Sequence, residues 1–364
     1  MSRFGMLAGR AAAGLIAAVA AVAAMACARG EGSSATNHDN DAGAFQLPDA
    51  PFDEDVQFHD GCGLLEVKYT KRVPSVVVLI DLSGSMDAAF GATTRYRAVR
   101  DALVGEPGGV LPLIDGEMRV GASLFNSNGG FADVCPQLFP ASPVIDLHTT
   151  STIRALLDAH TPWGDTPTGE SIDAVAARLA AFSPPEPPCP PSSICKYIVL
   201  ATDGEPDTCG HPNGFSDLAR QVSIEAVQRA FQKRGIATFV IGVGSDVGVP
   251  HLQDLANAGA GLDLKAPVPA KYYQALDGAS VLGAFHEIVE GVRSCSYTLD
   301  GKVKDGRGAT VKIDGGDPLV FDDPNGFRLD DGGHELILLG AACARIKTGY
   351  PTLEILVRCG DVAR

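Results

Sequence analysis

Four short runs of consecutive apolar residues alternate along the chain with stretches in which apolar residues recur at helical spacing. A continuous apolar run bounded by turn residues is typical of a strand buried on both faces of a sheet. The runs lie at residues 76–80, 120–125, 197–201 and 238–243. The stretches with helical spacing lie at residues 96–104, 153–159, 171–182, 218–231, 252–258 and 281–292. This alternation predicts an α/β fold with a doubly wound, mostly parallel sheet and helices on both faces.

The pattern changes after Cys295, where the helical period stops. Apolar residues then alternate with mostly polar ones at residues 352–359, and Asp-Gly and Asn-Gly pairs at 314–315 and 325–326 are typical of hairpin turns. Residues 296–364 are therefore predicted to form a small antiparallel β-module after the α/β domain. A short edge strand of the main sheet is expected at residues 143–148.

The first 60 residues differ from the rest of the chain. Two arginines precede an Ala-rich apolar run at residues 11–24, and small residues then lead to Cys27. This order predicts a secretory signal over residues 1–27, because the run is short for a membrane-spanning helix. The residues before Cys27 also resemble a bacterial lipobox, in which the cysteine is lipidated, although Ala24 stands where that pattern usually has Leu. Residues 28–60 are polar and aperiodic, as in a flexible tether.

Charge and cysteine content narrow the functional classes. The chain has 29 Lys plus Arg against 44 Asp plus Glu, a net charge of −15 that disfavours binding to nucleic-acid phosphates or an anionic membrane surface. With Cys27 assigned to a lipid, eight of the nine cysteines remain. An even number in an exported chain predicts disulfides in an oxidising compartment. Zinc is the alternative, but the sequence has no Cys-x-x-Cys pair and its histidines are scattered.

Oxygen-bearing side chains occur where two of the predicted strands end and before one predicted helix. They are Asp81, Ser83 and Ser85 after the first strand, Thr166 before the helix at 171–182, and Asp203 after the strand at 197–201. Each motif by itself is an ordinary turn or helix-capping sequence. Their order, however, places carboxylates and hydroxyls together at the carboxyl edge of the sheet, where open α/β sheets bind their ligands.

This arrangement resembles the von Willebrand factor type A domain. Members of that family build a metal-ion-dependent adhesion site from a first-strand Asp-x-Ser-x-Ser motif, a later Thr and a fourth-strand Asp. The resemblance covers residues 61–295 and implies five metal ligands, namely Asp81, Ser83, Ser85, Thr166 and Asp203. With its N-terminal features, the chain is also similar to exported bacterial lipoproteins that carry such a domain. Asp165 stands where family members usually have Gly.

The resemblance implies Mg²⁺ or Mn²⁺ as the cofactor. Ser83 and Ser85 would bind the ion directly, Thr166 directly or through water, and Asp81 and Asp203 mostly through water. Mg²⁺ prefers six oxygens in octahedral geometry, and Mn²⁺ accepts the same donors. Because the hydroxyl ligands are neutral, the ion stays electrophilic toward a carboxylate that a protein partner presents.

Three functional hypotheses follow. The first is an exported, lipid-anchored adhesion protein of the cell envelope that captures a partner's Asp or Glu at the metal and is not an enzyme. The second is a secreted hydrolase in which the ion activates water, which the lack of a nearby His or Lys as general base disfavours. The third is a structural envelope scaffold. Glu205, Asp207 and Asp87 lie near the same edge and are expected to be solvated loop charges rather than groups that tune the metal.

The topology of the family also implies a disulfide that closes the α/β domain. Cys62 precedes the first strand and Cys295 ends the last helix at the face opposite the metal, so these two are expected to pair. The other six cysteines leave their connectivity open. Placement on late strands favours Cys343–Cys359, and proximity favours Cys189–Cys195 and Cys135–Cys209.

Overall fold

The structure is a computed structural model that describes residues 64–128, 134–185, 194–211, 217–245, 248–330, 332–347 and 352–363. The expected signal sequence, lipidated Cys27 and tether therefore lie outside the described residues. Within these ranges, no helix combines the length and the apolar character needed to cross a bilayer.

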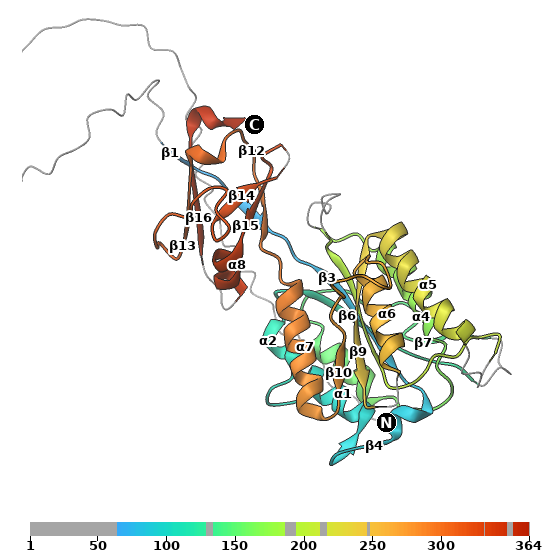
Figure 1. The fold of residues 1–364 in the computed structure, drawn as a ribbon. Helices are drawn as coiled ribbons and strands as arrows, with labels where there is room; N and C mark the ends of the chain where they lie inside the picture. The colour runs from blue at the N-terminus through green and yellow to red at the C-terminus, as the bar shows by residue number, and fades with distance from the viewer. Residues whose placement is uncertain are drawn as a thin grey trace, which may run out of the picture. The chain divides into compact units, whose positions relative to one another are not determined.

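Six strands form the central sheet of the α/β part (Figure 1). In spatial order they are β10 (Tyr273–Ala275), β9 (Ile236–Val243), β8 (Lys196–Thr202), β3 (Ser75–Asp81), β6 (Arg119–Asn126) and β7 (Gln137–Phe139). All neighbours pair in parallel except β6 and β7. Every residue of the central strand β3 is buried, which is the environment that a continuous apolar run predicts. All four predicted strands are confirmed.

Helices cover both faces of this sheet, so the predicted doubly wound fold is confirmed (Figure 1). One face carries α4 (Thr168–Ala181), α5 (Asp217–Arg234) and α6 (Val249–Gly259). The other carries α1 (Arg95–Val104), α2 (Val110–Ile114), α3 (Thr150–Asp158) and α7 (Gly278–Val292). Successive side chains of a strand point to opposite faces, so Val77 packs into one apolar core and Val78 into the other.

The prediction of an edge strand at residues 143–148 is wrong. The edge strand is β7, and the 143–148 segment contributes only an isolated bridge between Asp146 and Val120. Residues 143–145 instead pass over Gly121 of β6, where an added Cβ would lie 2.9 Å from the carbonyl oxygen of Val144. The glycine allows this close crossing, and a crossing segment cannot extend the sheet as a neighbouring strand would.

Residues from both sides of the α/β part build the β-module. Its two larger sheets have the orders β1-β16-β13 and β14-β15-β11-β2, and both are antiparallel as predicted. The bounds are β1 (Leu64–Glu66), β2 (Tyr69–Lys71), β11 (Ser296–Leu299), β13 (Ala309–Ile313), β14 (Phe327–Leu329), β15 (Glu335–Leu338) and β16 (Leu353–Arg358). A third pair joins β12 (Lys302–Val303) to β17 (Val362–Ala363), and the helix α8 (Gly340–Lys347) packs on the same apolar core.

The module therefore contains strands that precede the α/β part in the sequence. β1 pairs with β16 and β2 pairs with β11, so the α/β part is inserted between strands of the module. The α/β domain was expected to begin at residue 61. The strands β1 and β2 follow that residue in the sequence, yet they pair with strands of the β-module. These strands have three residues each, which is too short for a hydrophobic period to reveal their partners.

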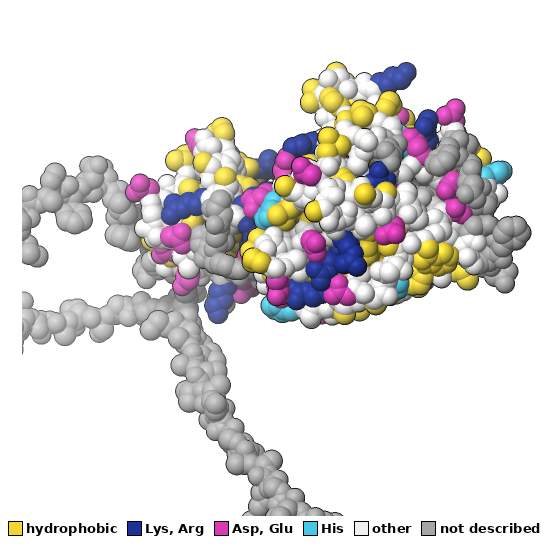
Figure 2. Space-filling view, turned by 90° about the horizontal axis from the view of Figure 1, so that it is seen from below, with side chains coloured by type: hydrophobic (Ala, Val, Ile, Leu, Met, Phe, Trp, Pro, Cys, Tyr) yellow, Lys and Arg dark blue, Asp and Glu magenta, His cyan; other side chains and the backbone are white. Residues whose placement is uncertain are grey.

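Charged side chains of both signs are mixed on the face that Figure 2 shows. The largest group of Lys and Arg side chains on that face has Asp and Glu side chains around it. Among the described residues, Arg100 contacts Asp101 at 2.8 Å and Asp158 at 2.9 Å, so its charge is compensated locally. The face that Figure 2 shows therefore carries no continuous basic surface among the described residues.

Candidate metal centre

Three loops meet at the carboxyl edge of the sheet and bring the five expected metal ligands close together. Asp81 is the last residue of β3, and Ser83 and Ser85 follow it directly. Asp203 follows β8, which pairs in parallel with β3, so the two strands end side by side. Thr166 lies two residues before the first residue of α4. Parallel pairing is therefore what places ligands from distant parts of the chain at one edge.

Hydrogen bonds join four of these residues into one network. The hydroxyl oxygens of Ser83 and Ser85 lie 3.0 Å apart, and the Ser85 hydroxyl donates to Oδ1 of Asp203 at 2.7 Å. Asp81 accepts a hydrogen bond from the backbone N–H of Ser83 at 2.8 Å and one from the Thr202 hydroxyl at 2.6 Å. Both carboxylates are completely buried, so their hydrogen bonds and charges decide whether they stay ionised.

A pocket of about 480 Å³ lies over this network and includes Thr166. It is lined by Ser83, Ser85, Arg95, Gly164, Asp165, Thr166, Asp203, Gly204, Glu205 and Asp207. A Cβ added to Gly204 would lie 3.6 Å from the Ser85 hydroxyl oxygen and 3.8 Å from the Thr166 hydroxyl oxygen. The two hydroxyls therefore flank the same space, which a side chain at position 204 would fill.

The donors fit a small, hard divalent cation. Adjacent oxygens of a regular Mg²⁺ octahedron with bonds of about 2.1 Å lie about 3.0 Å apart. The distance of 3.0 Å between the Ser83 and Ser85 hydroxyl oxygens matches that edge. No group of three His, Cys, Asp or Glu side chains suited to a metal occurs in the described part of the chain.

The two buried carboxylates influence each other electrostatically. Burial, and to a lesser extent the nearby charge of Asp203, raises the pKa of Asp81 to about 7. Hydrogen bonds from Ser83 and Thr202 favour the ionised form but do not outweigh these effects. A divalent cation in the pocket would favour ionisation of both carboxylates, because its charge is opposite to theirs.

Arg95 also belongs to this site, although no sequence motif indicated it. Its Nη1 donates to Oδ2 of Asp203 at 2.6 Å, and the residue is 8% exposed. The two residues are 108 positions apart, and a single Arg at the start of a helix forms no motif with either strand. Only the packing of α1 against the sheet brings them together.

Asp207 holds the loop that carries Thr166. Its backbone N–H donates to the carbonyl oxygen of Thr166 at 2.8 Å, and its Oδ2 accepts from the Thr166 N–H at 3.3 Å. Asp207 is only 5% exposed, so the expectation that it is a solvated loop charge is wrong. The acid is buried because it replaces water as the partner of the Thr166 backbone.

Glu205 and Asp87 differ in their environments. Burial opposes ionisation of Glu205, but hydrogen bonds from Arg220 and from the backbone of Gly248 outweigh it and lower the pKa. Glu205 is therefore a paired carboxylate on the pocket wall. Asp87 is exposed, as expected for a solvated loop charge.

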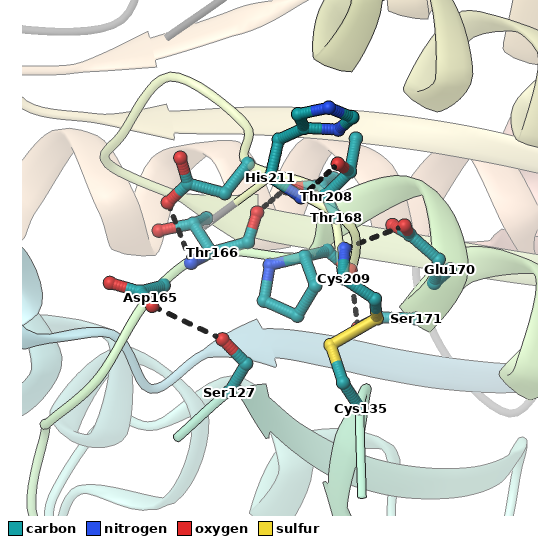
Figure 3. The surroundings of a disulfide bond; sticks show 12 residues. Ser127, Cys135, Asp165, Thr166, Thr168, Glu170, Ser171, Thr208, Cys209 and His211 are labelled. Carbon is teal, nitrogen blue, oxygen red and sulfur yellow. Dashed lines mark hydrogen bonds between the residues drawn. A yellow bond between two sulfur atoms is a disulfide. The ribbon is translucent and has the colours of Figure 1, made fainter. Parts of the chain in front are cut away.

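The loop that carries Thr166 is also held by an antiparallel bridge between Asp165 and Ser127. Asp165 and Ser127 exchange both backbone hydrogen bonds at 3.2 Å, and the Ser127 hydroxyl donates to Oδ2 of Asp165 at 3.4 Å (Figure 3). The preceding Gly164 has φ of +81°, and a Cβ there would lie 2.0 Å from the carbonyl oxygen of Ser127. A side chain at position 164 would therefore disrupt this pairing.

A disulfide lies beside the same loop. Cys135 bonds to Cys209, so the pairing expected from proximity is confirmed (Figure 3). The backbone N–H of Cys209 donates to Oε1 of Glu170 on α4 at 2.9 Å. The disulfide and this hydrogen bond anchor the segment that contains Asp207, and Asp207 in turn holds Thr166.

The other expected disulfides are only partly tested. Cys295 bonds to Cys343, so the expected pairings Cys62–Cys295 and Cys343–Cys359 are wrong. The reason is that Cys343 lies on α8, a helix that the sequence pattern did not reveal, and not on a late strand. Cys195 is disulfide-bonded, but Cys189, its expected partner, lies outside the described residues, as does Cys62.

A doubly wound sheet with this arrangement of acids and hydroxyls at its carboxyl edge defines a class of α/β ligand-binding domains. The family model for the von Willebrand factor type A domain matches residues 75–264, and the chain belongs to this family. The match ends before α7 and the C-terminal strands of the β-module. No curated protein matches the chain.

Several solved structures are similar to this chain at low sequence identity. The PilB minor pilin from Streptococcus sanguinis is 19% identical with a TM-score of 0.43, and the alignment covers 61% of this chain and 62% of that one. The pilus adhesin SpaC from Lactobacillus rhamnosus GG is 15% identical with a TM-score of 0.44, covering 81% and 43%. The von Willebrand factor domain of the type V pili tip protein Mfa5 from Porphyromonas gingivalis is 13% identical with a TM-score of 0.38, covering 61% and 96%. The chain thus spans about 62% of the length of the first of these.

Proposed function

We propose that the protein is an exported, metal-dependent adhesion or protein-binding protein. Its centre would hold Mg²⁺ or Mn²⁺ through the hydroxyls of Ser83, Ser85 and Thr166, with Asp81 and Asp203 as the acidic groups of the donor set. The observation that carries the proposal is the contact of Ser83 with Ser85 at 3.0 Å and of Ser85 with Asp203 at 2.7 Å. When bound, the ion would supply an electrophilic position for a partner's carboxylate.

Export is supported by two independent features. The Ala-rich run before Cys27 has the order of a secretory signal. The described disulfides, Cys135–Cys209 and Cys295–Cys343, are of the kind that persists in oxidising compartments. A lipid on Cys27 would attach the protein to the cell envelope. Mass spectrometry of the mature N-terminus tests this part of the proposal.

Binding is favoured over catalysis by the composition of the pocket wall. None of the described residues that line the pocket is a His or Lys, and its carboxylates Glu205 and Asp207 are held by Arg220 and by the backbone of Thr166. Hydrolysis of peptide, ester or phosphate substrates that disappears in Asp203→Ala would instead support the hydrolase alternative.

Titration calorimetry with Mg²⁺ and with Mn²⁺ tests the proposed centre. The oxidised protein is expected to bind one ion saturably, and Ser83→Ala is expected to weaken binding about 10- to 100-fold. Asp87→Ala is the matched control, because Asp87 is exposed on the same turn and does not line the pocket. A wild-type protein that binds neither ion, or a Ser83→Ala protein that binds as the wild type does, would contradict the proposal.

A further inference from the structure

Arg95 is held in place at the candidate metal centre from two sides. Its Nη1 donates to Oδ2 of Asp203 at 2.6 Å, and the exposed fractions of the two side chains are 10% and 0%. Its backbone N–H donates to the carbonyl oxygen of Ala88 at 3.2 Å. This bond closes the hairpin of β4 (Ala89–Phe90) and β5 (Thr93–Thr94) that leads into α1. Both ends of the side chain are therefore fixed by the fold.

Gly244 makes room for the guanidinium group. It follows β9 with φ of +103°, and a Cβ there would lie 3.0 Å from Nε and 3.2 Å from Cζ of Arg95. Its backbone N–H donates to the carbonyl oxygen of Ala275 at 2.7 Å, which fixes the backbone against β10. The guanidinium group thus lies between the backbone of Gly244 and the carboxylate of Asp203.

The positive charge of Arg95 is surrounded mainly by acidic residues of the pocket wall. Among the described residues that line the pocket, it supplies the single positive charge, whereas the carboxylates come from Asp165, Asp203, Glu205 and Asp207. Glu205 has a different cation, Arg220, as its partner at 2.8 Å. A positive charge in contact with one of the acidic groups of a divalent site both neutralises that group and repels the incoming ion.

We propose that Arg95 sets the affinity of the metal centre by competing with the divalent ion for the charge of Asp203. This inference rests on the proposed function. When no divalent ion is bound, Arg95 compensates the buried Asp203, so the loops remain ordered without metal. When an ion binds, the same charge opposes it, so the affinity is lower than the carboxylates alone would give. Arg95 is a positioning residue in this scheme, and occupancy of the centre follows the concentration of free divalent ion.

Three variants of the full chain test the proposal by calorimetry with Mg²⁺ and by thermal unfolding in EDTA and in Mg²⁺. Arg95→Gln removes the charge and is expected to bind Mg²⁺ about tenfold more tightly than the wild type. It is also expected to unfold at a lower temperature in EDTA and to gain more from added Mg²⁺. Arg95→Lys keeps the charge and should bind within about threefold of the wild type. Arg100→Gln is the control on the same helix, because Arg100 pairs with Asp101 and Asp158 outside the pocket.

The outcomes separate this inference from the proposed function. A wild-type protein that does not bind Mg²⁺ or Mn²⁺ refutes the proposed function, whatever the variants do. A wild-type protein that binds, with Arg95→Gln binding equally or more weakly, overturns the role of Arg95. If Arg95 had a purely structural role, Arg95→Gln would not bind Mg²⁺ more tightly than the wild type. If Arg95→Gln is unfolded in EDTA, recovery of its circular dichroism on addition of Mg²⁺ supports the proposal, because the ion then replaces the lost charge. If Mg²⁺ does not restore the fold of Arg95→Gln, the proposal is wrong.

Discussion

The backbone N–H of Trp163 donates a hydrogen bond of 2.8 Å to the carbonyl oxygen of Leu82. This bond ties the loop before α4 directly to the loop after β3. A second one, from the N–H of Gly84 to the carbonyl oxygen of Gly164 at 3.0 Å, joins the same two loops in the opposite direction. Because both bonds are between backbone groups, the relative positions of Ser83 and Thr166 depend on loop conformation and not only on side-chain contacts.

Gly164→Ala tests whether this loop conformation matters. The new Cβ would lie 2.0 Å from the carbonyl oxygen of Ser127, and φ at this position is +81°. We expect a loss of about 2–4 kcal/mol in the free energy of unfolding. We also expect weaker Mn²⁺ binding, because Thr166 would shift with the loop. Urea unfolding and Mn²⁺ calorimetry measure the two effects.

Gly91→Ala is the matched control for that variant. Gly91 has φ of +66°, but an added Cβ would have no atom within 4 Å. Gly91→Ala should lower the free energy of unfolding by only about 1–2 kcal/mol, because Ala disfavours the left-handed backbone conformation. Its Mn²⁺ affinity should equal that of the wild type. Equal losses of stability and affinity in the two variants would show that the clash with Ser127 is unimportant.

The disulfide between Cys135 and Cys209 is expected to support the candidate metal centre. The double variant Cys135→Ser/Cys209→Ser should lose about 2–4 kcal/mol of stability, because the unfolded chain is no longer cross-linked. Its Mn²⁺ affinity should also fall, since the Cys209 segment holds Asp207 against Thr166. Calorimetry and urea unfolding under oxidising conditions measure both quantities.

The second described disulfide gives the comparison. Cys295→Ser/Cys343→Ser removes a cross-link in the β-module and should reduce stability without changing Mn²⁺ affinity. If both double variants bind Mn²⁺ as the wild type does, the segment around Cys209 does not control the position of Thr166.

His251 is expected to make the protein less stable in mild acid. It is 5% exposed, and burial lowers its pKa from 6.5 to about 4, while the charge of Glu205 acts in the opposite direction. Between these values the unfolded chain binds a proton that the folded protein does not bind. The stability contribution is therefore complete above about pH 6.5 and is lost as the pH falls toward 4.

The expected loss over that range is about 1–3 kcal/mol. His251→Gln has no titrating ring and should show a correspondingly flatter dependence of unfolding free energy on pH. His148→Gln is the control, because the ring of His148 is 70% exposed. Parallel pH curves for the wild type and His251→Gln would rule out this role of His251.

Tyr69 provides a test of the inserted topology. It lies on β2, which precedes the α/β part in the sequence. The centroids of its ring and of the Tyr297 ring nevertheless lie 5.3 Å apart, and its hydroxyl donates to the carbonyl oxygen of Leu353 at 2.9 Å. Tyr69→Ala should destabilise the β-module by about 1–3 kcal/mol. Hydrogen exchange should then become faster at amides of residues 296–347 and 352–363. Exchange that accelerates equally in β3 and β8 would contradict separate stabilisation of the module. Val320→Ala, at a position 64% exposed, is the control.

The sequence by itself determined the architecture of the α/β part and the place of Asp81, Ser83 and Ser85 after its central strand. The strands at residues 76–80, 120–125, 197–201 and 238–243 were predictable because a strand buried on both faces needs a continuous apolar run. The position of Asp81, Ser83 and Ser85 at the edge of the sheet was predictable because these residues directly follow such a strand. Local sequence carries this information, since each feature depends on residues within a few positions of one another.

Tertiary structure alone decided which distant groups meet. The pair of Arg95 with Asp203, the burial of Asp207 under Thr166 and the bond between Cys295 and Cys343 join segments with no common sequence pattern. Packing of α1 on the sheet places Arg95, the loop after β8 places Asp207, and the unexpected helix α8 places Cys343. The same holds for β1 and β2, because the whole inserted part separates them in the sequence from their partners β16 and β11. Such contacts are selected by the burial of complementary surfaces, which no local spacing encodes.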